Sequence, residues 1–247
     1  MHVFSLGLTM RRLAIVPARG GSKRIKNKNI TDFLGKPLIS YSLEAVSTSR
    51  LFDCVHVSTD SSQIAAVSAS LGYPVDFMRP ANLSDDFTGL LPVLRWVVSE
   101  YESTGMLFDT VTCVFPAAPL LLADDLISAN AHFEQSKCKY PLLSFSEYPV
   151  PLEWAFRDLG QGVCCPINQE MLSVRSQDLS PAYYETGCFA IYSIEHLRAG
   201  NLSFSRTLAH FIPRHRSVDI DNPSDLEYAK KLYLSSTPNS RYGGEPL

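Results

Sequence analysis

The chain has 247 residues, of which 45% are hydrophobic, and its 22 basic and 25 acidic residues give a formal net charge of −3. A chain of this length can bury enough apolar surface to fold without disulfides or a structural metal. So small a net charge creates no field that would hold a polyanion or an anionic bilayer, which excludes nucleic acid and membrane surfaces as partners bound by bulk electrostatics. Any anion has to be bound at a local site.

The sequence contains no apparent membrane span or export signal. The most apolar stretch, 111–123, is interrupted by Pro116 and Pro119 and is shorter than the roughly 18 uninterrupted apolar residues that a span requires. The first residues have no basic start, and Arg11 and Arg12 follow the mildly apolar run instead of preceding it. The six cysteines contain no Cys-x-x-Cys motif. We therefore expect a protein of the reducing cytoplasm.

Strand and helix patterns alternate through the first half of the chain. The expected strands are residues 13–16, 55–58, 75–78 and 110–115. The expected helices begin at Pro37, at Ser61 or Ser62, at Leu90 and at Asp124. This alternation predicts an α/β fold with a mainly parallel sheet between layers of helices, because parallel neighbours need crossover connections. Ligands of such sheets bind beyond the carboxyl ends of the strands.

The pattern changes in the middle of the chain. Prolines interrupt short extended pieces over residues 140–192, which indicates an insertion instead of another crossover unit. The helical pattern returns at Asn222, which we predict to cap a helix with Asp225 in its first turn. We therefore predict a single domain over 11–235, with the insertion at about 140–192, and a loose tail over 236–247.

A cluster of basic residues follows the first expected strand. Residues 11–36 contain eight basic residues and one acidic residue, whereas an even distribution would place about two basic residues there. The basic residues are Arg11, Arg12, Arg19, Lys23, Arg24, Lys26, Lys28 and Lys36.

The loop within this cluster has the composition of an anion site. Gly20, Gly21 and Ser22 allow a sharp turn that aims backbone N–H groups at an anion, and Arg19 and Lys23 add full charges. We interpret the loop as a site for a nucleotide triphosphate, although it matches neither the P-loop nor the dinucleotide-binding turn. A solvated basic loop or a weak nucleic-acid arm is the second interpretation. It is disfavoured because no aromatic residues for stacking bases are interleaved with the charges.

An acidic pair lies near the other end of the chain. In an extended segment, Asp219 and Asp221 lie on the same face while Ile220 faces the core. Two convergent carboxylates suit Mg²⁺, which completes its coordination shell with water and substrate phosphates. The alternative is that Asp221 only helps to cap the following helix and Asp219 is solvated. Together with the basic loop, the pair provides the minimum equipment for nucleotidyl transfer.

These motifs occur in the order found in the sugar-activating cytidylyltransferases, the family of the CMP-sialic acid synthetases, and the resemblance covers about residues 12–234. The matching segments are VPARGGSK (16–23), KN (28–29), GKP (35–37), VSTD (57–60), RP (79–80), LSDD (83–86), VDID (218–221) and DL (225–226). Three further segments resemble the branch that activates pseudaminic acid: RSQDL (175–179), YYETG (183–187) and IPR (212–214).

The resemblance implies a Rossmann-like nucleotidyltransferase fold, a homodimer whose insertion reaches the partner's site, and a reaction between CTP and a nine-carbon α-keto acid sugar. It implies Mg²⁺ on Asp219 and Asp221, with Lys23 as a further catalytic residue. The implied nucleotide-binding residues are Ala18, Arg19, Gly20, Gly21, Ser22, Lys23, Lys28, Asn29 and Arg79. The implied sugar-binding residues are Arg175, Gln177, Glu185, Thr186 and Gly187.

The chain departs from the family in two places. Residues 115–121, FPAAPLL, stand where sialic-acid enzymes have Gln-Pro-Thr-Ser-Pro-Leu-Arg, so we expect backbone groups or first-loop residues to read cytosine. Tyr184 stands where the pseudaminic branch has a histidine. Arg214 and Arg216 are either salt-bridge partners or ligands of the sugar carboxylate. The same reaction on N-acylneuraminic or legionaminic acid, and a catalytically silent nucleotide-sugar binding protein, are the alternative functions.

Overall fold

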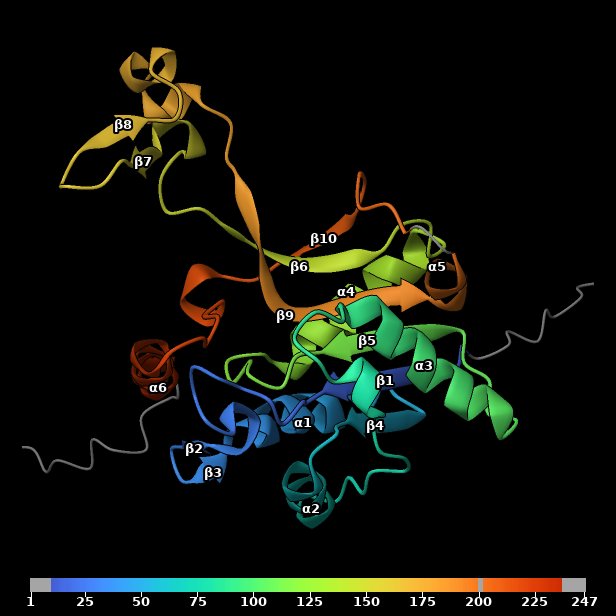
Figure 1. Ribbon diagram of the computed structural model, residues 1–247. Helices are drawn as coiled ribbons and strands as arrows, with labels where there is room; N and C mark the ends of the chain where they lie inside the picture. The colour runs from blue at the N-terminus through green and yellow to red at the C-terminus, as the bar shows by residue number, and fades with distance from the viewer. Residues whose placement is uncertain (1–9, 200–201, 237–247) are drawn as a thin grey trace, which may run out of the picture.

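The computed structural model describes residues 10–199 and 202–236 (Figure 1). The first nine residues, considered above for an export signal, lie outside the described residues. The predicted tail lies outside them from residue 237 on, and Ser236 is the last residue of a helix.

A six-stranded sheet with the strand order β10-β6-β9-β5-β1-β4 forms the centre of the molecule (Figure 1). Its strands are β1 (Arg12–Pro17), β4 (Cys54–Ser58), β5 (Thr110–Val114), β6 (Leu142–Glu147), β9 (Tyr183–Ser193) and β10 (Leu208–Phe211). Only β9 runs antiparallel to its neighbours, β5 and β6, and the other neighbouring strands pair in parallel. The predicted α/β fold with a mainly parallel sheet is confirmed.

Helices cover both faces of this sheet. The helices are α1 (Leu38–Ser49), α2 (Ser62–Ser70), α3 (Leu90–Ser103), α4 (Ala123–Gln135), α5 (Ile194–Arg198) and α6 (Pro223–Ser236). Within β1, Ala14 and Val16 pack in the core cluster that contains α1 and α4, whereas Leu13 and Ile15 pack in the cluster that contains α3 and α5. Alternate residues of a buried strand therefore supply two separate cores. No helix among the described residues is long and apolar enough to cross a membrane.

Several 3-10 turns and two small sheets complete the described structure. The turns are η1 (Lys28–Ile30), η2 (Ala81–Leu83), η3 (Leu152–Trp154), η4 (Glu170–Ser173), η5 (Ser176–Asp178) and η6 (Arg214–Arg216). The small sheets pair β2 (Asp32–Phe33) with β3 (Lys36–Pro37), and β7 (Phe156–Asp158) with β8 (Cys164–Pro166). The β7–β8 sheet lies in a lobe between β6 and β9 that projects away from the central sheet (Figure 1). The domain boundaries and the extent of the insertion stay predictions.

Two local predictions are wrong. Residues 75–78 form no strand, because side-chain contacts hold this segment and no backbone hydrogen bonds pair it with a neighbouring strand of the described structure. Asp76 accepts a hydrogen bond from Tyr101, and Phe77 stacks on the buried ring of His56. Asp124 does not cap α4. The N-cap position is Leu122, whose backbone N–H donates to the Asp125 carboxylate at 3.0 Å. A carboxylate in the third helical position can satisfy such a donor by reaching back toward the helix start.

The start of α6 is as predicted and also fixes the acidic segment before it. The side chain of Asn222 accepts a hydrogen bond from the backbone N–H of Asp225 at 3.1 Å. In return, the Asp225 carboxylate accepts from the backbone N–H groups of Asp221 and Asn222, both at 2.9 Å. These reciprocal bonds satisfy donors that a helix start leaves unpaired. The backbone of Asp221 is thereby attached to the helix.

A third hydrophobic cluster packs α6 against the β2–β3 turn and α1. The rings of Phe33, Tyr41 and Tyr233 meet edge to face, with centroid distances of 5.0 Å, 5.8 Å and 5.1 Å. Ile220 is fully buried in the same cluster. Edge-to-face aromatic pairs stabilise a cluster beyond the area that they bury. The side chain between the two aspartates is therefore anchored in a rigid aromatic core.

Replacing Phe33 with alanine should lower the free energy of unfolding by about 3–5 kcal/mol, because the cavity lies at the junction of three elements. Urea denaturation would measure this loss. Phe87→Ala is the matched control: Phe87 is 95% exposed, whereas Phe33 is 0% exposed. The control should change stability by no more than about 0.5 kcal/mol. Equal effects of the two variants would contradict the assigned role of this cluster.

Candidate active site

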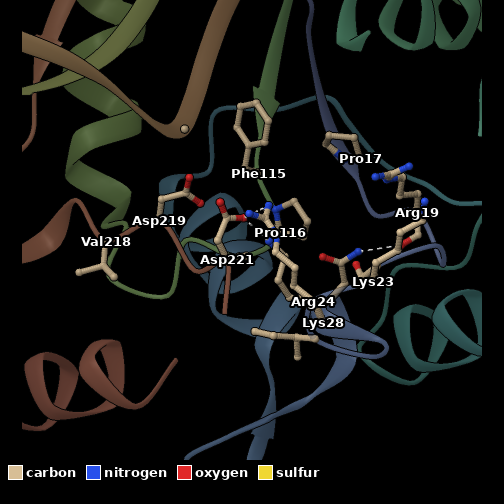
Figure 2. A pocket seen from close by; sticks show the side chains of 15 residues that line it. Pro17, Arg19, Lys23, Arg24, Lys28, Phe115, Pro116, Val218, Asp219 and Asp221 are labelled. Atoms are coloured by element: carbon tan, nitrogen blue, oxygen red, sulfur yellow. Dashed lines mark hydrogen bonds and ion pairs between the residues drawn. The ribbon is translucent and has the colours of Figure 1, made fainter. Parts of the chain in front are cut away.

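A pocket of about 510 Å³ lies beyond the carboxyl ends of β1 and β5 (Figure 2). Its walls come from the first loop (17–29), the segment after β5 (115–117), β9 and the segment 218–221. The predicted site residues that line it are Arg19, Ser22, Lys23, Lys28, Asn29, Gly187, Asp219 and Asp221. The basic loop and the acidic pair therefore share one pocket, at the sheet edge where α/β folds bind ligands.

The backbone of the first loop is held from outside. The Gly20 N–H donates to the Asp60 carboxylate at 2.8 Å, and the buried Asn29 side chain donates to the carbonyl of Arg19 at 3.0 Å. Asp60 therefore stabilises the loop. Gly21 has no atom within 4 Å of the position that a Cβ would take. A Cβ at Gly20, by contrast, would lie 2.9 Å from the Cβ of Ser61, so the loop has a tightly packed glycine next to an open one.

Asp86 meets the two cations expected to hold a triphosphate. One carboxylate oxygen accepts from Arg19 at 2.7 Å, and the other pairs with Lys23. The hydrogen bonds from Lys23 and Arg19 lower the pKa of Asp86. Asp86 belongs to the LSDD segment that resembles the family, but no role was predicted for it. The matching motif was the only hint in the sequence that Asp86 belongs to the site. Its ion pairs could not be predicted, because Asp86 is 63 residues beyond Lys23 in the chain.

The acidic pair is compensated unevenly. Asp221 accepts from Arg24 at 2.8 Å and lies 3.6 Å from the ammonium of Lys28, which also donates to the carbonyl of Ile220 at 2.6 Å. For Asp219, by contrast, there is no hydrogen bond or ion pair within the part of the chain that the structure describes. Burial raises the pKa of Asp219, and the charge of Asp221 raises it further.

This donor set fits a hard divalent cation that is shared with phosphate. Within residues 10–199 and 202–236, no group of three or more His, Cys, Asp or Glu side chains could hold a metal by itself. Mg²⁺ bound to nucleotides needs only one or two protein carboxylates, because water and phosphate oxygens complete its shell. Two neighbouring carboxylates, one of which forms no ion pair within the described residues, are such a set.

The predicted sugar-binding residues of β9 lie beside the acidic pair. Gly187 lines the pocket with a φ of +61°, a left-handed conformation that favours glycine. Burial and the charge of Asp219 raise the pKa of the neighbouring Glu185. Thr186 is buried and donates to Ser144 at 2.8 Å, so its hydroxyl group is engaged in the sheet.

Eight predicted site residues do not line this pocket: Ala18, Gly20, Gly21, Arg79, Arg175, Gln177, Glu185 and Thr186. Arg175 and Gln177 lie in the projecting lobe, where Arg175 pairs with Asp178 at 2.8 Å. Their predicted role in sugar binding stays a prediction. Arg79 is buried and donates twice to Ser58, at 2.6 Å to its carbonyl and at 3.1 Å to its hydroxyl.

The contact between Arg79 and Ser58 supports the loop from below. The same carbonyl of Ser58 accepts from the backbone N–H of Ala18 at 2.9 Å. Ala18 is fully buried at the base of the loop. In this structure Arg79 therefore acts on the pocket through β4, without lining it. Hydrogen bonds from a charged guanidinium are stronger than those from a neutral donor, which suits Arg79 to bind the end of this strand.

Arg24 was not predicted as a site residue, and the role of Arg216 was open between a salt bridge and binding of the sugar carboxylate. Arg24 was counted in the basic cluster without a role, and its partner Asp221 is 197 residues away. Arg216 is a salt-bridge partner: it pairs with Asp125 at 2.5 Å. Phe115 lines the pocket beside Pro116 and Ala117, as its place after β5 suggested.

The chain matches a protein-family model and several known proteins by sequence. A family model described as Cytidylyltransferase matches residues 13–151. The chain is 38% identical to the pseudaminic acid cytidylyltransferase of Campylobacter jejuni, over 91% of this chain and 97% of that protein. It is 27% identical to the CMP-N,N'-diacetyllegionaminic acid synthase of Legionella pneumophila, over 90% of this chain and 96% of that protein.

The fold is also found among solved structures. The structure of a CMP:2-keto-3-deoxy-manno-octonic acid synthetase complexed with CTP matches with a TM-score of 0.67 and 15% identity, over 91% of this chain and 99% of that one. At this identity the match supports the fold alone. The family model and the Campylobacter relative carry the assignment by sequence. The chain belongs to the cytidylyltransferase family of nucleotidyltransferases.

Proposed function

We propose that this enzyme transfers CMP from CTP to the anomeric hydroxyl of pseudaminic acid, giving CMP-pseudaminic acid and pyrophosphate. The observation that carries the proposal is the meeting of the basic loop and the acidic pair in one pocket. The 38% identity to a pseudaminic acid cytidylyltransferase supports this choice of nucleotide and sugar.

In the proposed reaction, Arg19, Ser22 and Lys23 bind the triphosphate. The sugar's hydroxyl oxygen forms a bond to the α-phosphorus, the bond from that phosphorus to the β-phosphate oxygen breaks, and the hydroxyl proton is released. Negative charge then develops on the leaving pyrophosphate. The guanidinium of Arg19 and the ammonium of Lys23 neutralise that charge, which is how most phosphoryl-transfer sites accelerate reaction.

Asp219 and Asp221 hold Mg²⁺ in this proposal, and the metal would neutralise phosphate oxygens and lower the pKa of the attacking hydroxyl. The uneven compensation of the two carboxylates supports the assignment, because a cation would relieve the repulsion at Asp219. Arg24 and Lys28 keep Asp221 next to the nucleotide loop. These contacts orient the acidic pair toward the phosphates.

The sugar side of the proposed site is formed by β9 and the segment after β5. Gly187 leaves room at the wall, Glu185 lies near Asp219, and Phe115 adds an apolar surface. We also propose a homodimer in which Arg175 and Gln177 of the projecting lobe contribute to the partner's sugar site. The exposed position of both residues, away from the pocket of their own chain, supports this arrangement.

Two alternatives remain. The same transfer to legionaminic or N-acylneuraminic acid uses the same nucleotide half of the pocket, and the 27% identical legionaminic acid synthase supports it. A catalytically silent nucleotide-sugar binding protein would keep the fold and lose turnover. The intact Arg19, Lys23, Asp219 and Asp221 argue against the silent protein.

Pyrophosphate release from CTP with a panel of nonulosonic acids separates these functions. We expect the highest kcat/KM with pseudaminic acid and no comparable turnover with ATP, GTP or UTP. A higher kcat/KM with legionaminic or N-acylneuraminic acid would reassign the substrate. Tight CTP binding without turnover on any acid would favour the silent binding protein.

Asp221→Asn should abolish turnover without unfolding the protein, because the pocket loses one of its two metal-ligand carboxylates. Steady-state kinetics at increasing Mg²⁺ and circular dichroism would measure the two effects. Glu227→Gln is the control, since Glu227 is an exposed carboxylate on α6 that pairs only with Lys230 among the described residues. Near-normal activity of Asp221→Asn in excess Mg²⁺ would refute the metal assignment.

The two glycines of the first loop offer a matched pair of variants. A Cβ at Gly20 would lie 2.9 Å from the Cβ of Ser61, the N-cap residue of α2, which is a rigid neighbour. Gly20→Ala should therefore displace the loop and weaken CTP binding about ten-fold, which is about 1.4 kcal/mol. Gly21→Ala meets open space and should bind within about two-fold of the parent. Calorimetric titration with CTP would measure both affinities. Equal affinities of the two variants would contradict the claim that the position of the loop controls CTP binding.

A further inference from the structure

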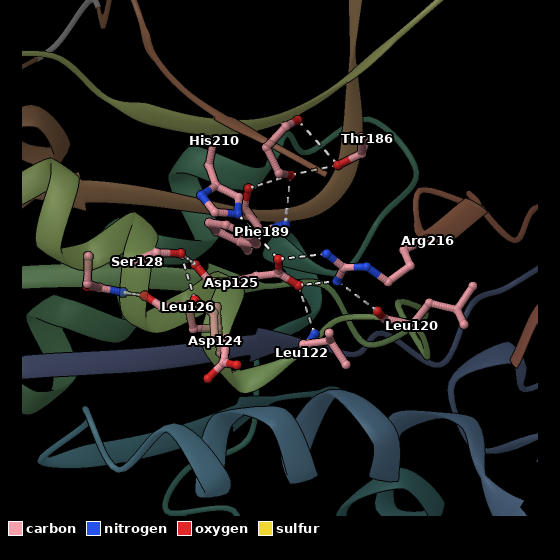
Figure 3. A network of polar contacts seen from close by, with 12 residues as sticks. Leu120, Leu122, Asp124, Asp125, Leu126, Ser128, Thr186, Phe189, His210 and Arg216 are labelled. Atoms are coloured by element: carbon pink, nitrogen blue, oxygen red, sulfur yellow. Dashed lines mark hydrogen bonds and ion pairs between the residues drawn. The ribbon is translucent and has the colours of Figure 1, made fainter. Parts of the chain in front are cut away.

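Beside the pocket, Arg216 and Asp125 form an ion pair that is mostly shielded from solvent (Figure 3). One guanidinium nitrogen of Arg216 donates to Asp125 at 2.5 Å, and a second donates to the other carboxylate oxygen at 3.1 Å. The side chains are only 15% and 8% exposed. A two-pronged pair of this kind defines the relative orientation of the elements that carry it, because both charges are costly to leave unpaired.

On one side, the pair holds the segment between β5 and α4. Asp125 accepts from the backbone N–H of Leu122 at 3.0 Å, and Arg216 donates to the carbonyl of Leu120 at 3.4 Å (Figure 3). The same segment begins with residues 115–117, which form one wall of the pocket. The ion pair therefore fixes the far end of that wall.

On the other side, the pair holds the turn η6 that precedes the acidic segment. Ser217, which follows Arg216, is buried and lies 3.0 Å from the hydroxyl of Tyr184 on β9. Val218 and Asp219 come next in the chain and line the pocket. The turn is thus tied to α4 by Arg216 and to β9 by Ser217, immediately before the carboxylates.

The charge of the pair is retained in spite of its surroundings. Burial by itself raises the pKa of Asp125, but hydrogen bonds from His210 and Arg216 and from the backbone of Leu122 lower it below its ordinary value. Asp125 is therefore ionised at neutral pH. None of the hydrogen bonds of Asp125 or Arg216 reaches the first loop, 17–29, within the described residues.

We propose that Asp125 and Arg216 are positioning residues that set the distance between the wall 115–117 and the carboxylates Asp219 and Asp221. The pair thereby controls how much Mg²⁺ strengthens the binding of CTP, and it has little influence on the binding of CTP by the basic loop alone. The proposal rests on the proposed function of the site, in which both carboxylates hold the metal.

The chain contains a suitable comparison for a purely structural ion pair. Arg12 of β1 pairs with Glu134 at 2.5 Å, with side chains 22% and 33% exposed. Glu134 lies at the last turn of α4, whereas Asp125 lies at its first turn. Both pairs attach the same helix, but only the Asp125 pair leads to the acidic segment. Glu134→Gln therefore controls for loss of stability.

The test compares Asp125→Asn, Arg216→Met and the double variant with the parent and with Glu134→Gln. CTP affinity is measured by calorimetry twice, once in excess EDTA and once in excess Mg²⁺, together with thermal unfolding. We expect the gain in affinity from Mg²⁺ to fall at least five-fold in both single variants, with metal-free affinity within two-fold of the parent. The double variant should lose no more of the gain from Mg²⁺ than either single variant, because each single variant already removes the same ion pair.

Glu134→Gln should unfold at a lower temperature and keep the full gain from Mg²⁺. Arg216→Lys, which keeps the charge but loses the two-pronged contact, should recover part of the gain and serves if Asp125→Asn does not fold. Three results would overturn the proposal. The Asp125 and Arg216 variants could keep the full gain from Mg²⁺, they could lose as much affinity without the metal as with it, or the CTP affinity of the parent could be independent of Mg²⁺. Absence of turnover with every acid would refute the proposed function alone, since the binding measurements do not require a sugar.

Discussion

The carboxylate of Asp221 joins the basic loop after β1 to the segment before α6. It lies 2.8 Å from Arg24 and 3.6 Å from Lys28, across 197 and 193 residues of sequence respectively. The adjacent Ile220 is fully buried in an aromatic cluster, and Asp225 holds the backbone of Asp221 at the start of α6. One apolar anchor, one helix start and one ion pair therefore place the acidic segment against the basic loop.

The sheet brings these parts within reach of one another. Parallel pairing of β1, β4 and β5 turns their carboxyl ends to the same edge, where the segments after β1 and β5 line the pocket. Strand β9 runs in the opposite direction, so its first residues, not its last, lie at this edge. Gly187 lies two residues before Phe189, the partner of the last residue of β5, and it therefore lines the pocket at this edge. Because β9 is antiparallel, its amino-terminal half contributes to the wall of the pocket; in a parallel strand these residues would lie at the opposite edge of the sheet.

The basic and acidic side chains around the pocket compensate one another in separate pairs. Asp86 engages Arg19 and Lys23, and Asp221 engages Arg24 and Lys28, while Asp219 has none of these cations as a direct partner. The exposed pairs contribute little to stability, because solvent screens them. Their effect is to hold long, flexible cations near the place where phosphate charge would develop. The more deeply buried contacts of Arg79 and Arg216 support the backbone beneath and beside that place.

The sequence by itself determined the alternation of strands and helices, the cap of α6 by Asn222, and the chemistry of the basic loop and the acidic pair. These follow from local spacing, since the period of apolar residues, a capping side chain and the i, i+2 relation of Asp219 and Asp221 are all set within a few residues. Local spacing was insufficient at residues 75–78, where contacts of Asp76 and Phe77 with distant aromatic residues replace a strand.

Only the tertiary structure decided which charges meet. The partners of Asp221, Asp86 and Arg216 are separated from them by between 63 and 197 residues, and no local pattern relates such positions. The burial of Arg79 under the loop was equally invisible in the sequence, because an arginine in a basic, ligand-binding region has the same letter whether it faces a ligand or a strand end. Packing of the sheet and its helices determines which of these positions become neighbours, and the neighbours determine what each charge can do.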